Sequence, residues 1–135
     1  MTTRMSSVVP VRREADVVVA REAGRALAAE IGFLRSSLVL VTTAISEVAR
    51  NIVRYAGEGS VELARDHEGS RPGIVIVARD AGPGIEDVQR ALQIGYSTGR
   101  GLGLGLPACQ TLMDEFDITS NPGEGTTIVM RKWLD

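Results

Sequence analysis

The sequence predicts an α/β (α+β) two-layer sandwich, in which helices cover one face of a single mixed, mostly antiparallel sheet. Three observations carry this prediction: a continuously apolar segment at 74–77, a helical apolar stripe over 38–55, and a glycine turn at 121–125 between two strand-like segments. The unbroken run Ile74-Val-Ile-Val77 is typical of a central strand that is buried on both faces. A chain of 135 residues is expected to form one domain, 1–135, with one core.

The first part of the chain predicts one strand and two helices. Residues 6–12 favour an edge strand, because Pro10 cannot donate to an interior ladder. A helix over about 17–31 follows, with Asp16 as N-cap and Gly32 after its end. Its expected buried stripe is Val19, Ala23, Leu27 and Ile31. A second helix over about 37–55, capped by Ser36 or Ser37, is expected to bury Leu38, Val41, Ile45, Val48, Ile52 and Tyr55.

The second part predicts two hairpins and two further helices. Alternation around Val61 and Leu63 indicates a strand that a loop from His67 to Gly73 joins to the central strand. Asp80 stands where that central strand ends. A short helix around 86–94, a polar stretch at 95–100 and a helix over about 103–115 come next. Strands at 117–121 and 126–133 are joined by the turn Asn121-Pro-Gly-Glu-Gly125.

Composition narrows the class of protein. Hydrophobic residues make up 44% and charged residues 24%, which is ordinary for a globular domain, and the formal charge of −2 gives no case for nucleic acid. No apolar run approaches the ~20 residues of a membrane span. The single cysteine, Cys109, is expected to be buried; it excludes an intrachain disulfide framework and fits the cytoplasm. With one cysteine and one histidine, His67, a structural zinc site is excluded.

The basic residues exclude one way of binding phosphate. Fourteen of the fifteen are arginine, and the one lysine, Lys132, lies near the end of the chain. A Walker-type loop needs a lysine directly after its glycines, so any nucleotide must be held differently.

Glu47 and Asn51 form the first chemically suggestive block. They are four residues apart on the second predicted helix, so their side chains lie one above the other. The Asn51 carbonyl is a hard oxygen ligand suited to Mg²⁺, and the Glu47 carboxylate is a candidate general base. Taken alone, the pair fits a solvated helix face better.

Asp80-Ala-Gly-Pro-Gly84 forms the second block. A carboxylate at the end of a buried strand can accept a hydrogen bond from an exocyclic amine such as that of adenine. Gly82 and Gly84 allow a flat ring to approach the backbone without Cβ clashes. The alternative is a plain β-turn, which the same residue types favour.

Gly101-Leu-Gly-Leu-Gly-Leu106 forms the third block. A linker would alternate glycine with serine, whereas here leucines alternate with glycines at the start of a predicted helix. Backbone amides at a helix N-terminus bind anions without lysine. A Rossmann site is disfavoured, because no apolar strand directly precedes the glycines and no acidic residue stands about 20 positions beyond. If the blocks converge, magnesium lies at Asn51, adenine at Asp80, and phosphates at Gly101, Leu102, Gly103, Leu104 and Gly105.

Taken in this order, the blocks resemble a known superfamily. Glu47 and Asn51 match the N box, Asp80-x-Gly-x-Gly84 and Gly101–Gly105 the two glycine boxes, and Gly125-Thr126 a late Gly-Thr element of the gyrase, Hsp90, histidine kinase and MutL ATPases. Within it, the chain from about residue 8 onward resembles the RsbT-type switch serine kinases, a subgroup close to the anti-sigma factor kinases. The closest matching segments are Thr42–Asn51, Gly101–Pro107, Leu112–Phe116 and Lys132–Leu134.

The resemblance implies a Bergerat-type ATP-binding fold and an ATP- and Mg²⁺-dependent serine kinase of a stressosome pathway. Such a kinase phosphorylates a STAS-domain antagonist and, when released, binds and activates a PP2C-type phosphatase. It also implies roles for residues: Asn51 as magnesium ligand, Glu47 as base, Asp80 as adenine contact and Thr126 as its support. Arg100, beside the glycines, is our own candidate for a charge contact to the terminal phosphate.

Two other functions stay open at this point. One is an anti-sigma factor kinase, which binds a sigma factor and phosphorylates a STAS anti-anti-sigma factor. The other is a binding module that uses nucleotide only to control affinity, without phosphoryl transfer. A sensor histidine kinase is disfavoured, because the one histidine, His67, lies in a predicted hairpin loop. Trp133 and Leu134 are expected to cap the core at the end of the last strand.

Overall fold

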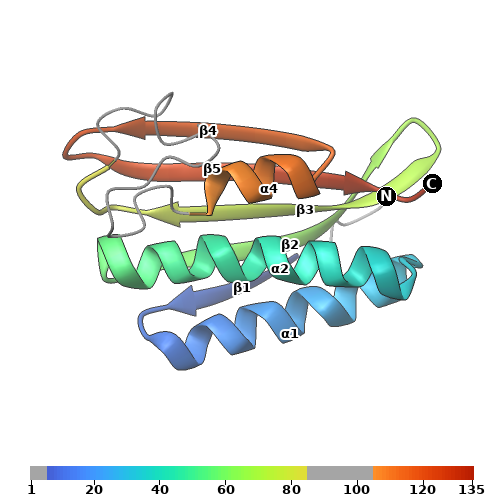
Figure 1. The fold of residues 1–135 in the computed structure, drawn as a ribbon, viewed down its shortest axis with the longest axis horizontal. Helices are drawn as coiled ribbons and strands as arrows, with labels where there is room; N and C mark the ends of the chain where they lie inside the picture. Colours follow the sequence, from blue (N-terminus) through green and yellow to red (C-terminus); the bar gives the residue numbers. More distant parts are fainter. Residues whose placement is uncertain (1–5, 85–104) are drawn as a thin grey trace.

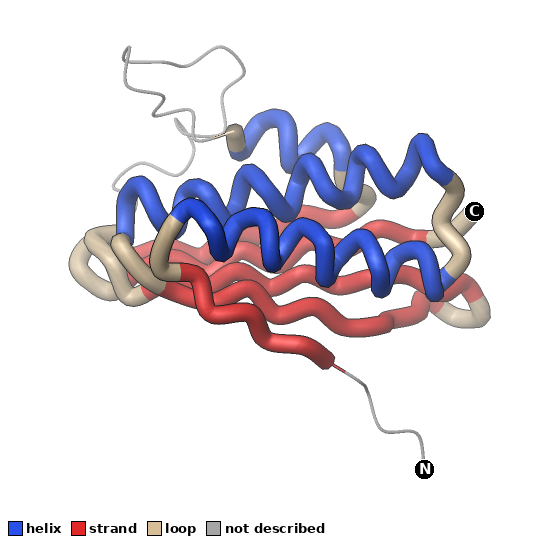
Figure 2. The backbone as a smooth tube through the Cα atoms, turned by 90° about the horizontal axis from the view of Figure 1, so that it is seen from below, coloured by secondary structure: helices blue, strands red, loops and turns tan. Residues whose placement is uncertain are grey.

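A computed structural model describes residues 6–84 and 105–135, and it shows helices packed on one face of a five-stranded sheet (Figures 1 and 2). The elements are β1 (Ser6–Val11), α1 (Glu14–Ile31), α2 (Arg35–Asn51), the π-helical turn η1 (Ile52–Ala56), β2 (Gly59–Glu68), β3 (Arg71–Asp80), α4 (Leu106–Leu112), β4 (Glu115–Asn121) and β5 (Gly125–Trp133). The predicted two-layer sandwich is confirmed. Where we expected a mixed, mostly antiparallel sheet, every strand pair that these residues form is antiparallel.

β3 is the central strand, as its apolar run predicts. The strand order is β1-β2-β3-β5-β4, and the side chains of Ile74 and Ile76 are fully buried. β1 lies at one edge, where Pro10 disturbs no second ladder. The register pairs Asp80, the last residue of β3, with Thr126 near the start of β5. This pairing places two predicted site residues side by side.

The β2–β3 hairpin is longer and tighter than we predicted. Its strands pair as far as Glu68 and Arg71, so the turn is Gly69-Ser70, and His67 lies within β2 instead of in a loop. Gly69 has φ +62°, which suits a two-residue hairpin turn. Residues 65–72 are mostly exposed and polar. Hydrophobic alternation therefore could not reveal this part of the ladder.

α1 begins three residues earlier than predicted. Arg13 is the N-cap, and Asp16 lies inside the first turn, where its Oδ2 accepts hydrogen bonds from the backbone N–H groups of Arg12 (2.9 Å) and Arg13 (3.3 Å). Asp16 thus takes the reciprocal position of a capping box instead of the N-cap itself.

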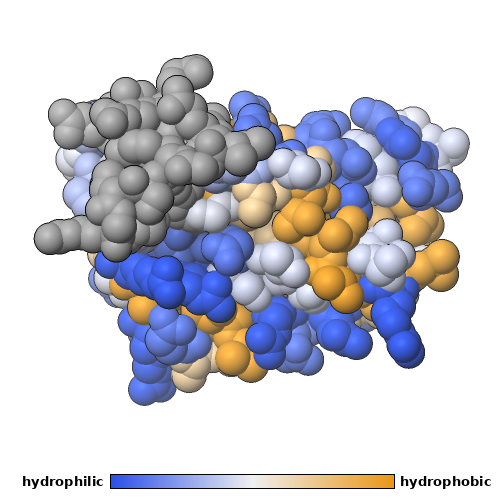
Figure 3. Space-filling view, viewed as in Figure 1, coloured by the Kyte–Doolittle hydropathy of each residue, from blue (hydrophilic) through white to orange (hydrophobic). Residues whose placement is uncertain are grey.

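The buried face of α1 also differs from the predicted stripe. The buried residues are Val17, Ala20, Gly24 and Ala28, whereas Val19 is 53% exposed and Ala23, Leu27 and Ile31 lie half-buried at the edge of the core. Gly24 faces Ile45 so closely that an added Cβ would overlap its side chain. Small residues let α1 approach α2, and this close packing determines which face is inward. Figure 3 views the side on which the helices lie, where apolar and polar surface alternate.

α2 confirms most of its predicted stripe: Val41, Ile45 and Val48 are buried, as is Ile52 just beyond its end, whereas Leu38 is only half-buried against the core. The helix begins at Arg35 after the N-cap Leu34, instead of after Ser36 or Ser37. By length and composition Arg35–Ala56 would suffice to cross a membrane (mean hydropathy 1.2), but its apolar stripe packs into the core.

The end of this helix changes form. It passes into η1 at Ile52, and the Gly57 N–H donates to the Ile52 carbonyl at 2.8 Å. Such π turns are frequent at functional sites. Tyr55, predicted to be buried, is only half-buried at the end of this turn.

The C-terminal elements follow the prediction with shifted ends. α4 ends at Leu112 because Met113 is extended (φ −105°, ψ 157°), and β4 and β5 each begin one or two residues early. The predicted turn at 121–125 is confirmed. The predicted helix around 86–94, the polar stretch 95–100 and the start of the helix at 103 lie outside the described residues.

The side chains of Trp133 and Leu134 lie on opposite faces of the sheet. Leu134 packs against the core, as expected. Trp133 is buried across Gly73, where its indole N–H donates to Glu115 Oε2 (3.1 Å) and the Arg71 guanidinium lies 5.9 Å from its ring centroid. Since β-strand side chains alternate, Gly73 and Trp133 face away from the buried Ile74. Trp133 therefore covers the sheet face that the described helices leave open.

Candidate active site

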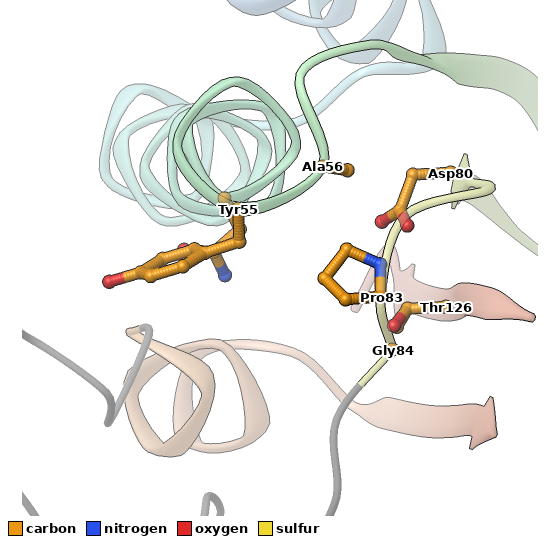
Figure 4. Close-up of a pocket in the computed structure, with 7 residues that line it drawn as sticks. Tyr55, Ala56, Asp80, Pro83, Gly84 and Thr126 are labelled. Atoms are coloured by element: carbon orange, nitrogen blue, oxygen red, sulfur yellow. The ribbon is translucent and has the colours of Figure 1, made fainter. Parts of the chain in front are cut away.

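A pocket lies between the end of α2, with the η1 turn that follows it, and the adjacent ends of β3 and β5 (Figure 4). About 340 Å³ of empty space, part of it open to solvent, is bounded by Asn51, Tyr55, Ala56, Asp80, Pro83, Gly84 and Thr126. Residues from the predicted N box, first glycine box and Gly-Thr element therefore line one cavity. These segments are more than 70 residues apart in sequence at their extremes and meet only through the fold.

Asp80 and Thr126 point to the same side of the sheet end (Figure 4). Asp80 Oδ1 accepts a hydrogen bond from the Gly82 N–H at 2.9 Å. The Thr126 hydroxyl lies 2.8 Å from that of Ser120, which also donates to the Gly125 carbonyl at 3.2 Å. Ser120 thus fixes the orientation of Thr126. The arrangement offers a carboxylate oxygen and a hydroxyl to one ligand.

Glycines hold the Asp80–Gly84 loop against its neighbours. Gly84 has φ +78°, and a Cβ there would strike the backbone of Asn121. A Cβ at Gly82 would lie 2.6 Å from that of Ala56 in η1. The Gly123 N–H also donates to the Pro83 carbonyl at 2.7 Å. The loop is therefore more than a plain β-turn, because it closes one side of the pocket.

Two glycines of the β4–β5 turn allow a matched test of this close packing. Gly125 has φ +98°, and an added Cβ would overlap the Asp80 carbonyl oxygen. Gly123 has φ +80°, and an added Cβ would meet nothing within 4 Å. We expect Gly125→Ala to lower the free energy of unfolding by about 2–4 kcal/mol, since backbone strain adds to overlap. Gly123→Ala should lose only the strain, about 1–2 kcal/mol. Urea unfolding measures both, and equal losses would contradict the close approach at Asp80.

Glu47 lies beside the pocket, one helical turn before Asn51. Its side chain is 31% exposed, and its Oε1 accepts a hydrogen bond from Arg50 Nη1 at 3.4 Å. A Cβ added at Gly105, which has φ +70° and precedes α4, would overlap Glu47 Oε2. Glu47 therefore contacts the last glycine of the third block. Glu47 and Asn51 are both half-buried, which does not fit a solvated helix face.

Cys109 lies behind Glu47, between α4 and α2. Its side chain is fully buried, and its thiol donates to the Ala44 carbonyl with an Sγ to O distance of 3.7 Å. Burial, and then the charge of Glu47, raise the pKa of the thiol from 9.0 to about 12. The expected burial of the thiol is confirmed, and its raised pKa disfavours the reactive thiolate.

This raised pKa predicts a pH dependence of stability. The folded thiol keeps its proton where the unfolded one loses it, so its contribution is complete below pH 9 and is lost as the pH rises from about 9 to about 12. Between pH 8 and pH 10, the wild type should lose about 1 kcal/mol more unfolding free energy than Cys109→Ala. Urea unfolding at both pH values measures this difference. Identical pH dependence in the two proteins would contradict it.

The remaining predicted phosphate-binding residues belong to the segment 100–105. Arg100, Gly101, Leu102, Gly103 and Leu104 lie outside the described residues, and Gly105 is the described member of that loop.

The pocket also contains residues that we did not predict as site residues, namely Tyr55, Ala56 and Pro83. Tyr55 follows Asn51 by four residues, so its helical spacing could have indicated it. Pro83 lies within the glycine box itself.

The donor set fits a magnesium nucleotide. Within 6–84 and 105–135 there is no cluster of three or more histidine, cysteine, aspartate or glutamate side chains that could enclose a metal. Mg²⁺ commonly takes few protein oxygens and completes its shell with water and substrate phosphates. The Asn51 amide is an oxygen donor of this kind on the wall of the pocket.

Comparisons with known proteins agree with this geometry. The model of the histidine kinase-like ATPase domain matches residues 9–132. The chain is 46% identical over 128 residues to the serine/threonine-protein kinase RsbT of Bacillus subtilis, covering 95% of this chain and 96% of that protein. It is 31% identical over 121 residues to the anti-sigma F factor of a Thermoanaerobacter species, covering 85% and 83%.

Solved structures share the fold. The RsbU and RsbW domains of a Mycobacterium tuberculosis protein match with TM-score 0.60 and 20% identity, over 97% of this chain and 32% of that longer one. The catalytic domain of the histidine kinase ThkA matches with TM-score 0.54 and 11% identity, over 94% and 95%. The family match and these relatives show that the chain belongs to the histidine kinase-like ATPase domain family, and its sheet and pocket agree with this.

Proposed function

We propose that this protein is an ATP- and Mg²⁺-dependent protein serine kinase of a bacterial partner-switching pathway, with residues 1–135 as one kinase domain. The observation that carries the proposal is the pocket where Asn51, Asp80, Gly84 and Thr126 meet, with Glu47 beside it at Gly105. A binding cavity alone suits any nucleotide-binding module. A carboxylate next to the phosphate loop adds a group that can accept a proton.

In this proposal each residue has a separate task. Asp80 accepts a hydrogen bond from the adenine amine, Gly82 and Gly84 let their loop pack closely against Ala56 and Asn121 beside the ring, and Thr126 supports the ring. Asn51 binds the magnesium ion. Gly101, Leu102, Gly103, Leu104 and Gly105 bind the phosphates through backbone amides, and Arg100 contacts the terminal phosphate.

Bound ATP supplies the phosphoryl group, with ADP as leaving group. Glu47 orients the substrate serine hydroxyl and accepts its proton as the serine oxygen bonds to phosphorus. The chain therefore supplies a proton acceptor and an amide ligand from α2, and an adenine-recognising carboxylate from the end of β3.

For partners, we propose a STAS-domain antagonist held in a stressosome as substrate, and a PP2C-type phosphatase as second partner, all in the cytoplasm. The 46% identity to a protein named serine/threonine-protein kinase RsbT supports this assignment over an anti-sigma factor kinase, whose named relative is 31% identical. Co-purification with a PP2C-type phosphatase favours the first, and co-purification with a sigma factor the second.

Radiolabelled ATP tests the kinase proposal directly. Purified protein is incubated with labelled Mg-ATP and the STAS-domain protein encoded beside its gene, and binding is followed in parallel by thermal shift. We expect label on the STAS protein and a rise in Tm with Mg-ATP. A Tm rise without label transfer supports the nucleotide-gated binding module instead, and no Tm rise excludes both functions.

A further inference from the structure

We infer that Arg50 is a positioning residue for Glu47: it binds one carboxylate oxygen, Oε1, and so directs the other, Oε2, toward Gly105 and the substrate hydroxyl. The inference rests on the proposed kinase function and names a residue that neither the motifs nor the relatives assign. Arg50 directly precedes Asn51, one turn after Glu47 on the same helix.

The two oxygens of Glu47 have different surroundings. Oε1 accepts a hydrogen bond from Arg50 Nη1 at 3.4 Å, whereas Oε2 lies against Gly105, where an added Cβ would overlap it. Among residues 6–84 and 105–135, Arg50 is the one ion-pair partner of Glu47. The neighbouring Cys109 thiol donates to the Ala44 carbonyl and so does not hold the carboxylate. Among the described residues, Arg50 is thus the one charged group that orients the Glu47 side chain.

The Arg50–Glu47 pair is less exposed to solvent than the surface ion pairs with which we compare it. The side chains of Arg50 and Glu47 are 30% and 31% exposed, against 71% and 75% for Arg12 and Glu58 and 46% and 68% for Arg65 and Glu30. Fully exposed pairs seldom fix a geometry, because solvent screens them and both side chains move. A half-buried pair between neighbouring turns of one helix holds its orientation better.

The chemistry of a general base explains why such an orientation matters. The base must present an oxygen within hydrogen-bond reach of the hydroxyl that it deprotonates. A guanidinium on Oε1 leaves Oε2, on the side of Gly105, as the accepting atom. Arginine suits this task because its planar donor group stays charged at every working pH.

The test replaces Arg50 by methionine, which keeps most of the stem and removes the donor. We expect kcat for phosphoryl transfer from Mg-ATP to the STAS protein to fall by about 10–100-fold, with the Kd for ATP changed by less than about twofold. Arg50→Lys should recover part of kcat. Arg54→Met, an exposed arginine one turn further along without a Glu47 contact, is the matched control and should retain wild-type kcat.

A double variant separates positioning from a general structural effect. In the Glu47→Gln background, Arg50→Met should cause no further loss of single-turnover rate, since the atom that it positions is already gone. An unchanged kcat in Arg50→Met, an equal loss of ATP affinity, or a multiplicative loss in the double variant would each overturn the inference. Absence of transfer by the wild type would instead refute the proposed kinase function.

Discussion

Glu47→Ala is expected to lower the rate of phosphoryl transfer to serine by about 10²–10⁴-fold while leaving the Kd for Mg-ATP within about twofold. The reason is the position of Glu47. It contacts Gly105 at the start of α4 but does not line the pocket formed by Asn51, Asp80 and Thr126. Its removal therefore takes away a proton acceptor without removing a wall of the nucleotide site.

Single-turnover kinetics with a STAS-domain substrate and calorimetry with Mg-ATP measure the two quantities separately. Glu62→Ala is a matched control, because Glu62 is 32% exposed and pairs with Arg79 at 3.3 Å on β2, outside the residues that line the pocket. It should transfer phosphate at the wild-type rate. Equal turnover by Glu47→Ala and wild type would remove Glu47 from the mechanism.

Asp80→Asn is expected to weaken ATP binding by about 10–150-fold, because a hydrogen bond to a charged acceptor contributes about 1.5–3 kcal/mol. Asparagine retains a side-chain oxygen that can accept from the Gly82 N–H, so the loop should stay folded. The loss should be specific for the base. Wild type should bind ATP more tightly than inosine triphosphate, which lacks the adenine amine, and Asp80→Asn should lose that preference.

Calorimetry with both nucleotides measures this discrimination, and Asp117→Asn on β4 is the control. Asp117 is exposed and does not line the pocket, so both affinities should match those of wild type. An unchanged ATP affinity in Asp80→Asn would refute the assignment of Asp80 as the adenine contact.

Hydrophobic patterns predicted the fold where burial is strong. The stripe of α2 and the apolar run of β3 appeared as expected, since Val41, Ile45, Ile74 and Ile76 are large and fully buried. The predicted buried face of α1 was wrong, because small residues such as Gly24 add little to a hydrophobic pattern. These small residues nevertheless decide how closely two helices pack. Burial patterns likewise say nothing about an exposed polar ladder such as the end of the β2–β3 hairpin.

The site could be predicted only as far as its local motifs extend. The order of the motifs predicted that Asn51 and Asp80 share one cavity, and the family resemblance added Thr126; all three line the pocket. Ser120 escaped notice because its contact with Thr126 arises from strand register. Arg50 escaped notice because many helices carry an acidic and a basic residue three apart, and only burial beside Gly105 distinguishes this pair.

The most direct test of the account is the chemical identity of the phosphorylated residue. The wild-type protein is incubated with Mg-ATP and the STAS-domain protein that we propose as its substrate, and that protein is then analysed by mass spectrometry before and after acid treatment. Because the fold is shared with histidine kinases, acid stability matters: phosphoserine survives acid, whereas phosphohistidine does not. We predict one acid-stable phosphoserine that forms only when the kinase is present and is strongly reduced with Glu47→Ala. An acid-labile phosphate, or an unmodified partner despite tight ATP binding, would contradict the assignment as a serine kinase.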